Sequence, residues 1–229
     1  MLHLDAGNTS SYPGTGTTWT DLSGNGNNGI LTNGPIYSSN NGGGIVFDGV
    51  DDFVNCGTGS TLNLSTSGSL SVWASISNYS GSSNYWAIAG KGAKDGFDTN
   101  GYTIWFYTGY VPIGTGSGSV YGHIANRTPV EHLTDGCYFG SDTVLGNTIH
   151  NYVLTWDSTT VSTYLDGVLI QATPYSYGAG DTTSVPFKIG SGPNDRYMNG
   201  SVYQVAVYNR TITTTELIQN YKFLRDRFS

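Results

Sequence analysis

Short runs of β-branched and aromatic residues recur along the chain, and clusters of Gly, Asn, Asp and Ser separate them. This pattern is typical of antiparallel sheets joined by tight turns. Residues 69–77 show it most clearly, because Leu70, Val72, Ala74 and Ile76 alternate with Ser or Trp. Such alternation turns one face toward a core and the other toward hydroxyl groups. The chain is therefore predicted to be all-β.

The same reasoning predicts ten further strands, enough for a sandwich of two stacked antiparallel sheets. These strands are expected at residues 44–48, 52–56, 85–89, 102–107, 119–125, 151–157, 161–165, 168–172, 185–190 and 201–208. Asp166 and Gly167 separate two of them. An Asp-Gly pair readily adopts the positive φ angles of a type I′ turn, so a tight hairpin is predicted there.

Only the C-terminus has a helical pattern. Thr213 and Glu216 have the spacing of a capping box, in which each side chain accepts a hydrogen bond from a free backbone N–H of the first turn. A helix is predicted at about residues 214–226. Its apolar stripe, expected to pack on the sandwich, consists of Leu217, Ile218, Tyr221 and Leu224.

The composition limits the partners of such a chain. Only 11% of the 229 residues are charged, the formal net charge is −7, and the nine Lys and Arg are thinly spread. Nucleic acid is therefore an unexpected partner. The sequence shows no apolar run of membrane-spanning length and no charged-then-apolar leader, so neither a membrane span nor a secretion signal is expected. Because composition is uniform along the chain, one domain over residues 1–229 is predicted.

The two cysteines, Cys56 and Cys137, are 81 positions apart and match no zinc-site spacing. Two readings stay open. Both can be small apolar residues that remain unpaired, or they can form one disulfide if their Cα atoms come within about 7 Å.

Several segments in succession resemble one known family. The resemblance is carried by residues 19–29, 45–54, 69–75, 150–156, 164–168, Gly190 and 198–210. In this order they look like a laminin-G-like (LamG) domain of the concanavalin A-like lectin/glucanase superfamily. The resemblance covers nearly the whole chain and implies a jelly-roll sandwich whose edge or concave face binds glycans or proteins. It fixes no function, because fold and function are separable.

The two ends of the chain have a narrower resemblance. Residues 2–8 and 12–19, together with residues 220–222 and Arg227-Phe228, look like the ends of such domains in structural proteins of tailed-phage virions. This likeness implies a stable, weakly charged module on the outside of a virion.

The superfamily includes glucanases, so hydrolysis must be considered. Retaining glycosidases need two carboxylates about 5–5.5 Å apart, which this family carries on one strand as E-x-D-x-x-E. The chain contains only Glu131, which lacks neighbouring carboxylates, and Glu216 of the capping box. The four histidines form no local cluster with Arg that would suggest a lyase. We therefore expect no enzymatic activity and no catalytic residues.

Three carboxylates lie within five residues at Asp48, Asp51 and Asp52. Hard oxygen ligands of this kind can begin a calcium site if backbone carbonyls complete it. The alternative is ordinary turn chemistry, in which Asp side chains accept hydrogen bonds from nearby N–H groups. No cofactor is expected to be required, and a structural calcium ion is predicted with Asp48 and Asp51 as its side-chain ligands.

Aromatic residues concentrate in or beside the predicted loops, and their flat rings can stack on sugars or anchor a protein interface. The alternative for each one is packing against its own sheet. The candidate ligand-binding residues are Tyr79, Tyr85, Trp86, Tyr107, Tyr110, Tyr121, Tyr175 and Tyr177.

The leading hypothesis is a non-catalytic module of the virion surface, in a decoration, fibre or tail-associated protein, that presents a face for glycans or the host surface. Its partners would be a glycan or host cell surface and other virion proteins, including further copies of itself. A carbohydrate-binding module of a secreted bacterial protein, and hence an extracellular location, is the first alternative. A purely architectural capsid or tail domain is the second.

Overall fold

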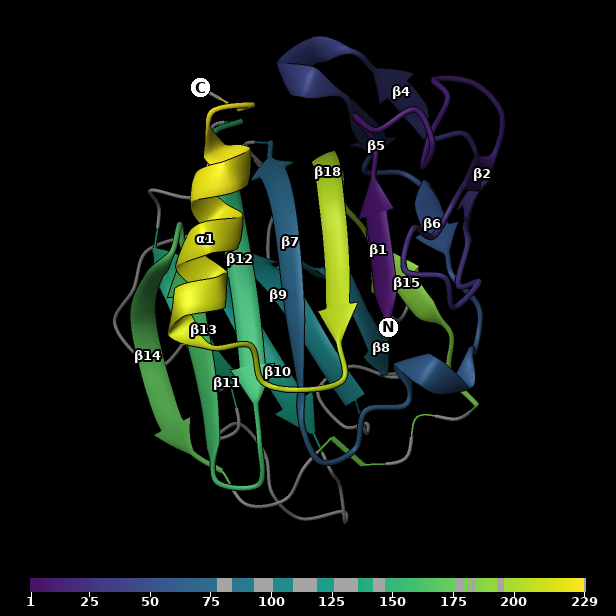
Figure 1. Cartoon of the computed structure of the whole chain (residues 1–229). Helices are drawn as coiled ribbons and strands as arrows, with labels where there is room; N and C mark the ends of the chain where they lie inside the picture. Colours follow the sequence, from purple (N-terminus) through teal and green to yellow (C-terminus); the bar gives the residue numbers. More distant parts are fainter. Residues whose placement is uncertain are drawn as a thin grey trace.

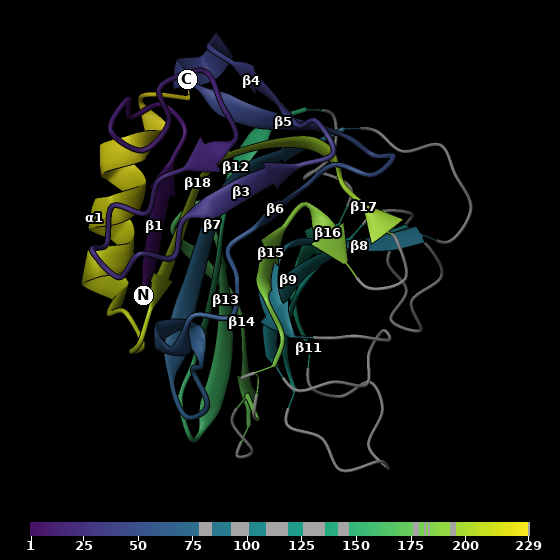
Figure 2. The ribbon, with the colours of Figure 1, turned by 90° about the vertical axis from the view of Figure 1, so that its right-hand side faces the viewer.

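The computed structural model describes residues 1–77, 84–92, 101–108, 119–125, 136–141, 147–175, 179–180, 182, 184–192 and 196–228. At residues 84–85, 107–108, 119, 125 and 136–141 it describes the backbone only. Within these residues, two eight-stranded antiparallel sheets stack face to face. One helix covers the outer face of one sheet (Figure 1 and Figure 2). We call that sheet the helix-covered sheet and the other the second sheet.

The helix-covered sheet has the order β14-β13-β12-β7-β18-β5-β4, and β1 also pairs with β18. Its strands are β1 (Leu2–Asp5), β4 (Ile36–Ser38), β5 (Gly44–Asp48), β7 (Gly68–Ile76), β12 (Ile149–Trp156), β13 (Thr160–Leu165), β14 (Val168–Pro174) and β18 (Asn199–Tyr208). One edge of β18 pairs with β7 from Gly200 to Tyr208, with one irregularity between Val202 and Gln204. The other edge is shared, because β5 pairs with its first residues and β1 with its last.

The second sheet has the order β11-β10-β9-β8-β15-β6-β3-β2. Its strands are β2 (Thr18–Trp19), β3 (Gly29–Thr32), β6 (Phe53–Asn55), β8 (Asn84–Gly92), β9 (Gly101–Thr108), β10 (Ser119–Ala125), β11 (Gly136–Ser141) and β15 (Phe187–Ile189). A two-stranded ribbon, β16 (Ser191–Gly192) and β17 (Arg196–Tyr197), and two short 3-10 helices, η1 (Asn40–Gly42) and η2 (Ser60–Leu62), complete the described elements apart from α1.

The core fills the space between the two sheets. It contains the alternating apolar residues of β7 that the sequence placed on one face, together with the large aromatic side chains of both sheets. The largest fully buried rings are Trp19, Phe47, Trp86, Tyr102, Phe106, Tyr152, Trp156 and Phe187. The predicted all-β sandwich is confirmed, and the strand pairing is consistent with a concanavalin A-like jelly roll.

Helix α1 (Thr214–Arg225) begins as the sequence predicts. The Thr213 side chain accepts a hydrogen bond from the Glu216 N–H, and the Glu216 carboxylate accepts one from the Thr213 N–H. Leu217 and Leu224 are buried against the outer face of the helix-covered sheet. The Tyr221 ring stacks on Trp73 of β7, with 5.6 Å between the ring centroids. The predicted apolar stripe is therefore a packing surface.

The predicted hairpin is also present. Asp166 and Gly167 both have positive φ angles, of 51° and 81°, and β13 and β14 pair on either side of them. Asp166 also fixes the neighbouring strand, because its carboxylate accepts the Asn151 N–H at 2.8 Å and lies 2.6 Å from His150 Nδ1.

One aspect of the sequence prediction needs correction, and one open alternative is resolved. Seven strands were not predicted, because each is short or lies in a segment rich in Gly, Asn and Ser: β1, β2, β3, β4, β11, β16 and β17. The cysteine question is settled for Cys56, which is a free thiol buried in the core, so its pairing with Cys137 is excluded. Burial raises the pKa of the Cys56 thiol. Among the described residues, no helix is long and apolar enough to span a membrane.

Candidate functional site

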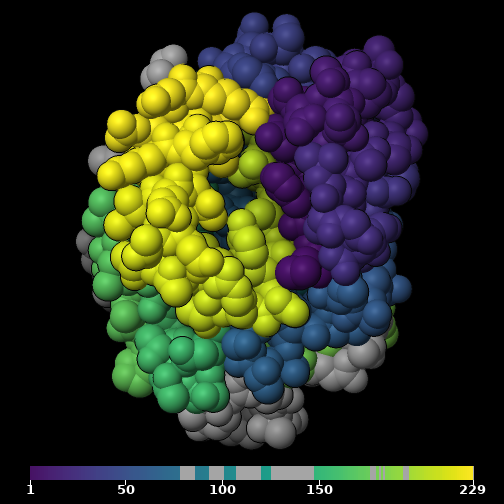
Figure 3. Space-filling view, in the orientation of Figure 1, coloured from purple at the N-terminus to yellow at the C-terminus, as the bar shows by residue number. Residues whose placement is uncertain are grey.

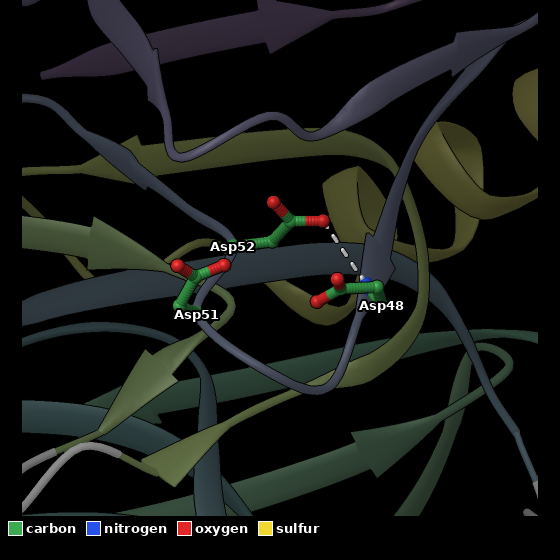
Figure 4. A group of neighbouring side chains, drawn as sticks. All are labelled: Asp48, Asp51 and Asp52. Atoms are coloured by element: carbon green, nitrogen blue, oxygen red, sulfur yellow. Dashed lines mark hydrogen bonds between the residues drawn. The ribbon is translucent and has the colours of Figure 1, made fainter.

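The predicted acidic residues meet at one turn between the two sheets. Asp48 ends β5, and Asp51 and Asp52 lie just before β6. Ligand oxygens of the three carboxylates lie within 4.8 Å of one another, and Figure 4 shows the side chains gathered around the turn. Asp48 and Asp51 are exposed and Asp52 is buried. The sequence named Asp48 and Asp51 as ligands, and in the structure the Asp52 carboxylate lies beside theirs.

Part of this arrangement is ordinary turn chemistry. The Asp48 carboxylate accepts the Val50 N–H at 2.8 Å, and the Asp52 carboxylate accepts the Asp48 N–H at 3.1 Å. The Asn33 amide donates to the Asp51 backbone carbonyl at 2.9 Å. These bonds engage only some of the six carboxylate oxygens, since Asp51 accepts none through its side chain among the described residues.

The electrostatics of the turn favour a cation. Burial raises the pKa of Asp52, the charges of Asp48 and Asp51 raise it further, and the hydrogen bond from the Asp48 N–H partly opposes this. Within the described part of the chain, no basic side chain forms an ion pair with the three carboxylates. Carboxylate oxygens are the ligands that calcium prefers, although its six to eight ligands would require further backbone oxygens or water.

The register of the second sheet brings three of the eight predicted aromatic binding residues onto adjacent strands, because Tyr85 is paired with Tyr107, and Tyr121 is paired with Trp105, two residues from Tyr107. Tyr79, Tyr110 and Tyr177 lie outside the described residues. Tyr85 of β8 is paired with Tyr107 of β9, but only their backbones are described.

Three members of the aromatic set have described side chains. Tyr121 of β10 is half-buried. Trp86 and Tyr175 are 2% and 5% exposed and belong to the core, where Trp86 packs against Phe106 with 4.7 Å between ring centroids. This removes Trp86 and Tyr175 from the predicted binding set, because a ring enclosed in the core offers no face to a ligand.

The residues considered for catalysis have structural contacts. Arg210 donates to both Glu216 carboxylate oxygens, at 2.8 and 2.7 Å. These hydrogen bonds, together with those from Thr213, lower the pKa of Glu216 to about 2. Glu216 is therefore ionised at neutral pH and unsuited to act as a general acid. His150 is mostly enclosed, and its Nδ1 contacts Asp166. Glu131 lies outside the described residues.

A different feature, which the sequence did not indicate, lies on the outer face of the helix-covered sheet. His3 of β1 pairs with Ala206 of β18, and Ala206 pairs with Ser71 of β7. Their strand neighbours point into the core, so these three side chains point outward. Figure 3 shows a hollow there, between α1 and the N-terminal segment, whose floor has the colours of β7 and β18. We call it the β7–β18 hollow.

Polar groups line the next row of the same face. Gln204 of β18 pairs with Asp5 on one side and Trp73 on the other. The Gln204 amide nitrogen lies 3.2 Å from His3 Nε2. The Asn151 amide of β12 donates to the Ser71 hydroxyl at 3.1 Å. Single alternating residues on four strands thus bring together an imidazole, two amides and a hydroxyl, which no short motif in the sequence could reveal.

Comparison with known proteins identifies the family. A family described as the concanavalin A-like lectin/glucanases superfamily (Laminin_G_3) matches residues 48–218. The chain belongs to this superfamily. The search of curated proteins gave no match. The likeness read from the sequence segments is therefore confirmed for the family.

Solved structures agree with the fold. Domain 4 of a GH43 extracellular arabinanase from Geobacillus stearothermophilus, solved in complex with arabinotriose, matches with a TM-score of 0.62 and 15% identity, over 95% of this chain and 96% of that one. The binding domain of botulinum neurotoxin serotype G matches with a TM-score of 0.67 and 12% identity, over 97% of this chain and 50% of that one. The sialidase of Trypanosoma rangeli matches with a TM-score of 0.61 and 14% identity, over 96% of this chain but 32% of the enzyme.

Proposed function

We propose that this chain is a non-catalytic carbohydrate-binding module. The observation that carries the proposal is the match, along nearly the full length of both chains, to an arabinanase domain solved in complex with arabinotriose. A structure of botulinum neurotoxin type C, whose cell entry depends on interaction with two ganglioside molecules, matches over 98% of this chain. This match supports the same class of ligand. A weakly charged surface rich in hydroxyls and amides suits such ligands, which are recognised through hydrogen bonds.

The absence of catalysis is part of the proposal. It is supported by the content of only two Glu and by the engagement of Glu216 with Arg210 in the helix cap. Incubating the protein with neutral polysaccharides and measuring released reducing ends tests it. Turnover above that of a heat-treated sample would contradict the proposal.

We propose that this module is located on a virion surface, because the two ends of the sequence resemble those of domains in tailed-phage virion proteins. A secreted bacterial protein is the alternative. The fold serves both settings equally, so localisation must be measured on the source particle. Detection of the chain on purified virions by immunogold electron microscopy is expected, and its presence only in culture supernatant would favour the alternative.

A glycan array followed by calorimetry tests the central function. We expect dissociation constants in the micromolar to millimolar range for at least one saccharide, because a shallow surface site buries little ligand area. If no saccharide binds, the carbohydrate-binding function is wrong.

Assembly is a second candidate function, and a specific observation favours it. β14 is the last strand of the helix-covered sheet, and Val168, Leu169 and Ile170 are 62%, 53% and 41% exposed. An exposed apolar edge strand without a charged residue is a template for pairing with another chain. Light scattering after gel filtration should detect a dimer that Leu169→Lys dissociates, with Val50→Lys in the exposed acidic turn as control. A wild-type monomer at all concentrations would contradict this role.

We also propose that calcium binds the acidic turn through Asp48, Asp51 and Asp52. For a dissociation constant of about 0.1 mM, 5 mM calcium would stabilise the fold by about 2 kcal/mol. The unfolding temperature should therefore rise by about 4–8 °C over a chelated sample, and Asp51→Asn should reduce the rise. Magnesium serves as the control ion. Identical unfolding temperatures with calcium and with chelator would exclude the site.

A further inference from the structure

We propose that the β7–β18 hollow is a subsite for one ring of a neutral saccharide. This inference rests on the proposed carbohydrate-binding function and gives it a location that is independent of the aromatic loops. The hollow arises because two small residues, Ala206 and Ser71, stand side by side in the outward-facing row. On one side of them is His3 of β1, and on the other is Val153 of β12, which packs under α1.

The dimensions of the row fit one sugar ring. Neighbouring strands lie about 4.8 Å apart, and successive outward residues on one strand lie about 7 Å apart. A floor of two adjacent small residues therefore extends across about two neighbouring strands. Along each strand it extends over about the distance between two successive outward-facing residues. A larger side chain at either position would occupy this space, since the rows beyond it already hold Trp73 and Tyr208.

The groups around the floor retain hydrogen-bonding capacity. The Ser71 hydroxyl accepts from the Asn151 amide, and within the described residues its own proton has no acceptor. The Gln204 side-chain nitrogen contacts His3, and the Gln204 carbonyl oxygen has no described donor. The second ring nitrogen of His3 also has no described partner. These are the donors and acceptors that vicinal sugar hydroxyls require.

The charge around the hollow selects for a neutral ligand. The one carboxylate in the neighbouring row, Asp5, is paired with Arg227, whose Nη1 lies 2.6 Å from it. Among the described residues of the outward rows that form the floor, this pair leaves neither an unpaired cation to hold a sialic acid carboxylate nor an unpaired anion to hold an amine. Specificity then depends on hydrogen bonds to hydroxyl groups, as expected for pentose or hexose rings.

Two substitutions separate the shape of the hollow from its chemistry. Ala206→Leu fills the floor, and Ser71→Ala removes a hydroxyl without changing the shape. Ala172→Leu on the exposed part of β14 is the matched control, because it adds the same side chain elsewhere on the helix-covered sheet. Near-ultraviolet circular dichroism confirms that each variant is folded before binding is measured.

Calorimetry with arabinotriose, cellotriose and 3′-sialyllactose provides the test. We expect at least one neutral trisaccharide to bind the wild type and Ala172→Leu equally, Ala206→Leu to weaken it at least tenfold, and Ser71→Ala to weaken it severalfold. If both hollow variants bind as the wild type does, the location is wrong while the carbohydrate-binding function stands. Binding of sialyllactose alone overturns the neutral class, and no binding by any glycan on the array overturns the function itself.

Discussion

Arg227 fastens the C-terminus of the chain to its N-terminus, and its removal gives a stringent test of the structure. Its guanidinium donates to the Asp5 carboxylate at 2.6 Å and to the backbone carbonyls of Gly42 and Gly43 at 3.1 and 3.2 Å. It also lies 5.0 Å from the centre of the Phe228 ring. One side chain thus joins β1, η1 and the residues that follow α1.

The expected cost of Arg227→Ala follows from the burial of the pair. The Arg227 and Asp5 side chains are only 20% and 12% exposed. Without the guanidinium, the Asp5 carboxylate keeps only the Gly7 N–H among its described partners. A hydrogen bond to a charged group contributes about 1.5–3 kcal/mol, and leaving a charge partly buried adds to the loss. We expect a loss of about 2–3 kcal/mol of unfolding free energy, allowing for the remaining exposure.

Thermal and urea unfolding, followed by tryptophan fluorescence, measure this loss. For a chain of this size it should lower the unfolding temperature by about 4–12 °C. Arg225→Ala is the matched control, because Arg225 pairs with Asp226 at 3.2 Å and the two side chains are 52% and 81% exposed. Its effect should stay below about 0.5 kcal/mol. Equal effects of the two variants would refute the assigned role of Arg227.

Three further changes test the packing and the electrostatics. Gly190→Ala should lower the unfolding free energy by about 2–4 kcal/mol, because residue 190 has a φ of +78° and a Cβ there would lie 2.6 Å from the Phe47 ring. Its control is Gly57→Ala, which also has a positive φ but open space around the added Cβ, and it should lower the unfolding free energy by only about 1 kcal/mol. Lys91→Met should cost less than about 2 kcal/mol, because it removes the hydrogen bond that the buried ammonium donates to the Val185 carbonyl at 2.6 Å but also a charge that burial disfavours by lowering its pKa, and a larger loss would contradict this. Glu216 has a pKa lowered from 4.5 to about 2, so its stabilising effect is present above pH 4.5 and disappears as the pH falls toward 2. Glu216→Gln should therefore flatten the decline of the unfolding temperature over that range, and an unchanged profile would contradict the assignment.

The predictions that held depend on interactions between residues close in sequence. The Asp166-Gly167 turn, the cap made by Thr213 and Glu216, and the alternation in β7 all act over a few residues. The closeness of the carboxylates at the acidic turn is equally local, because Asp48 and Asp52 are brought together by one tight loop, whereas calcium binding there stays a prediction. Local chemistry is sufficient for such features.

The features that were missed depend on distant residues. β1 has only four residues, and it is a strand because it pairs with the end of β18, about 200 residues later. Trp86 was assigned to a binding rim from its position beside a loop, yet β8 begins two residues earlier and turns its ring into the core. Exposure of an aromatic residue is set by the opposing sheet, about which the local sequence carries no information.

The β7–β18 hollow and the Arg227 contact are physically connected, and this gives a last prediction. The walls of the hollow are β1 with His3 and the segment containing α1, and Arg227 joins them through Asp5. Arg227→Ala should therefore weaken binding of a neutral trisaccharide even at temperatures where the variant is fully folded, while Arg225→Ala should leave affinity unchanged. Calorimetry at 10 °C measures both. If Arg227→Ala keeps wild-type affinity, the stacking of Tyr221 on Trp73 is sufficient to hold the helix wall in place.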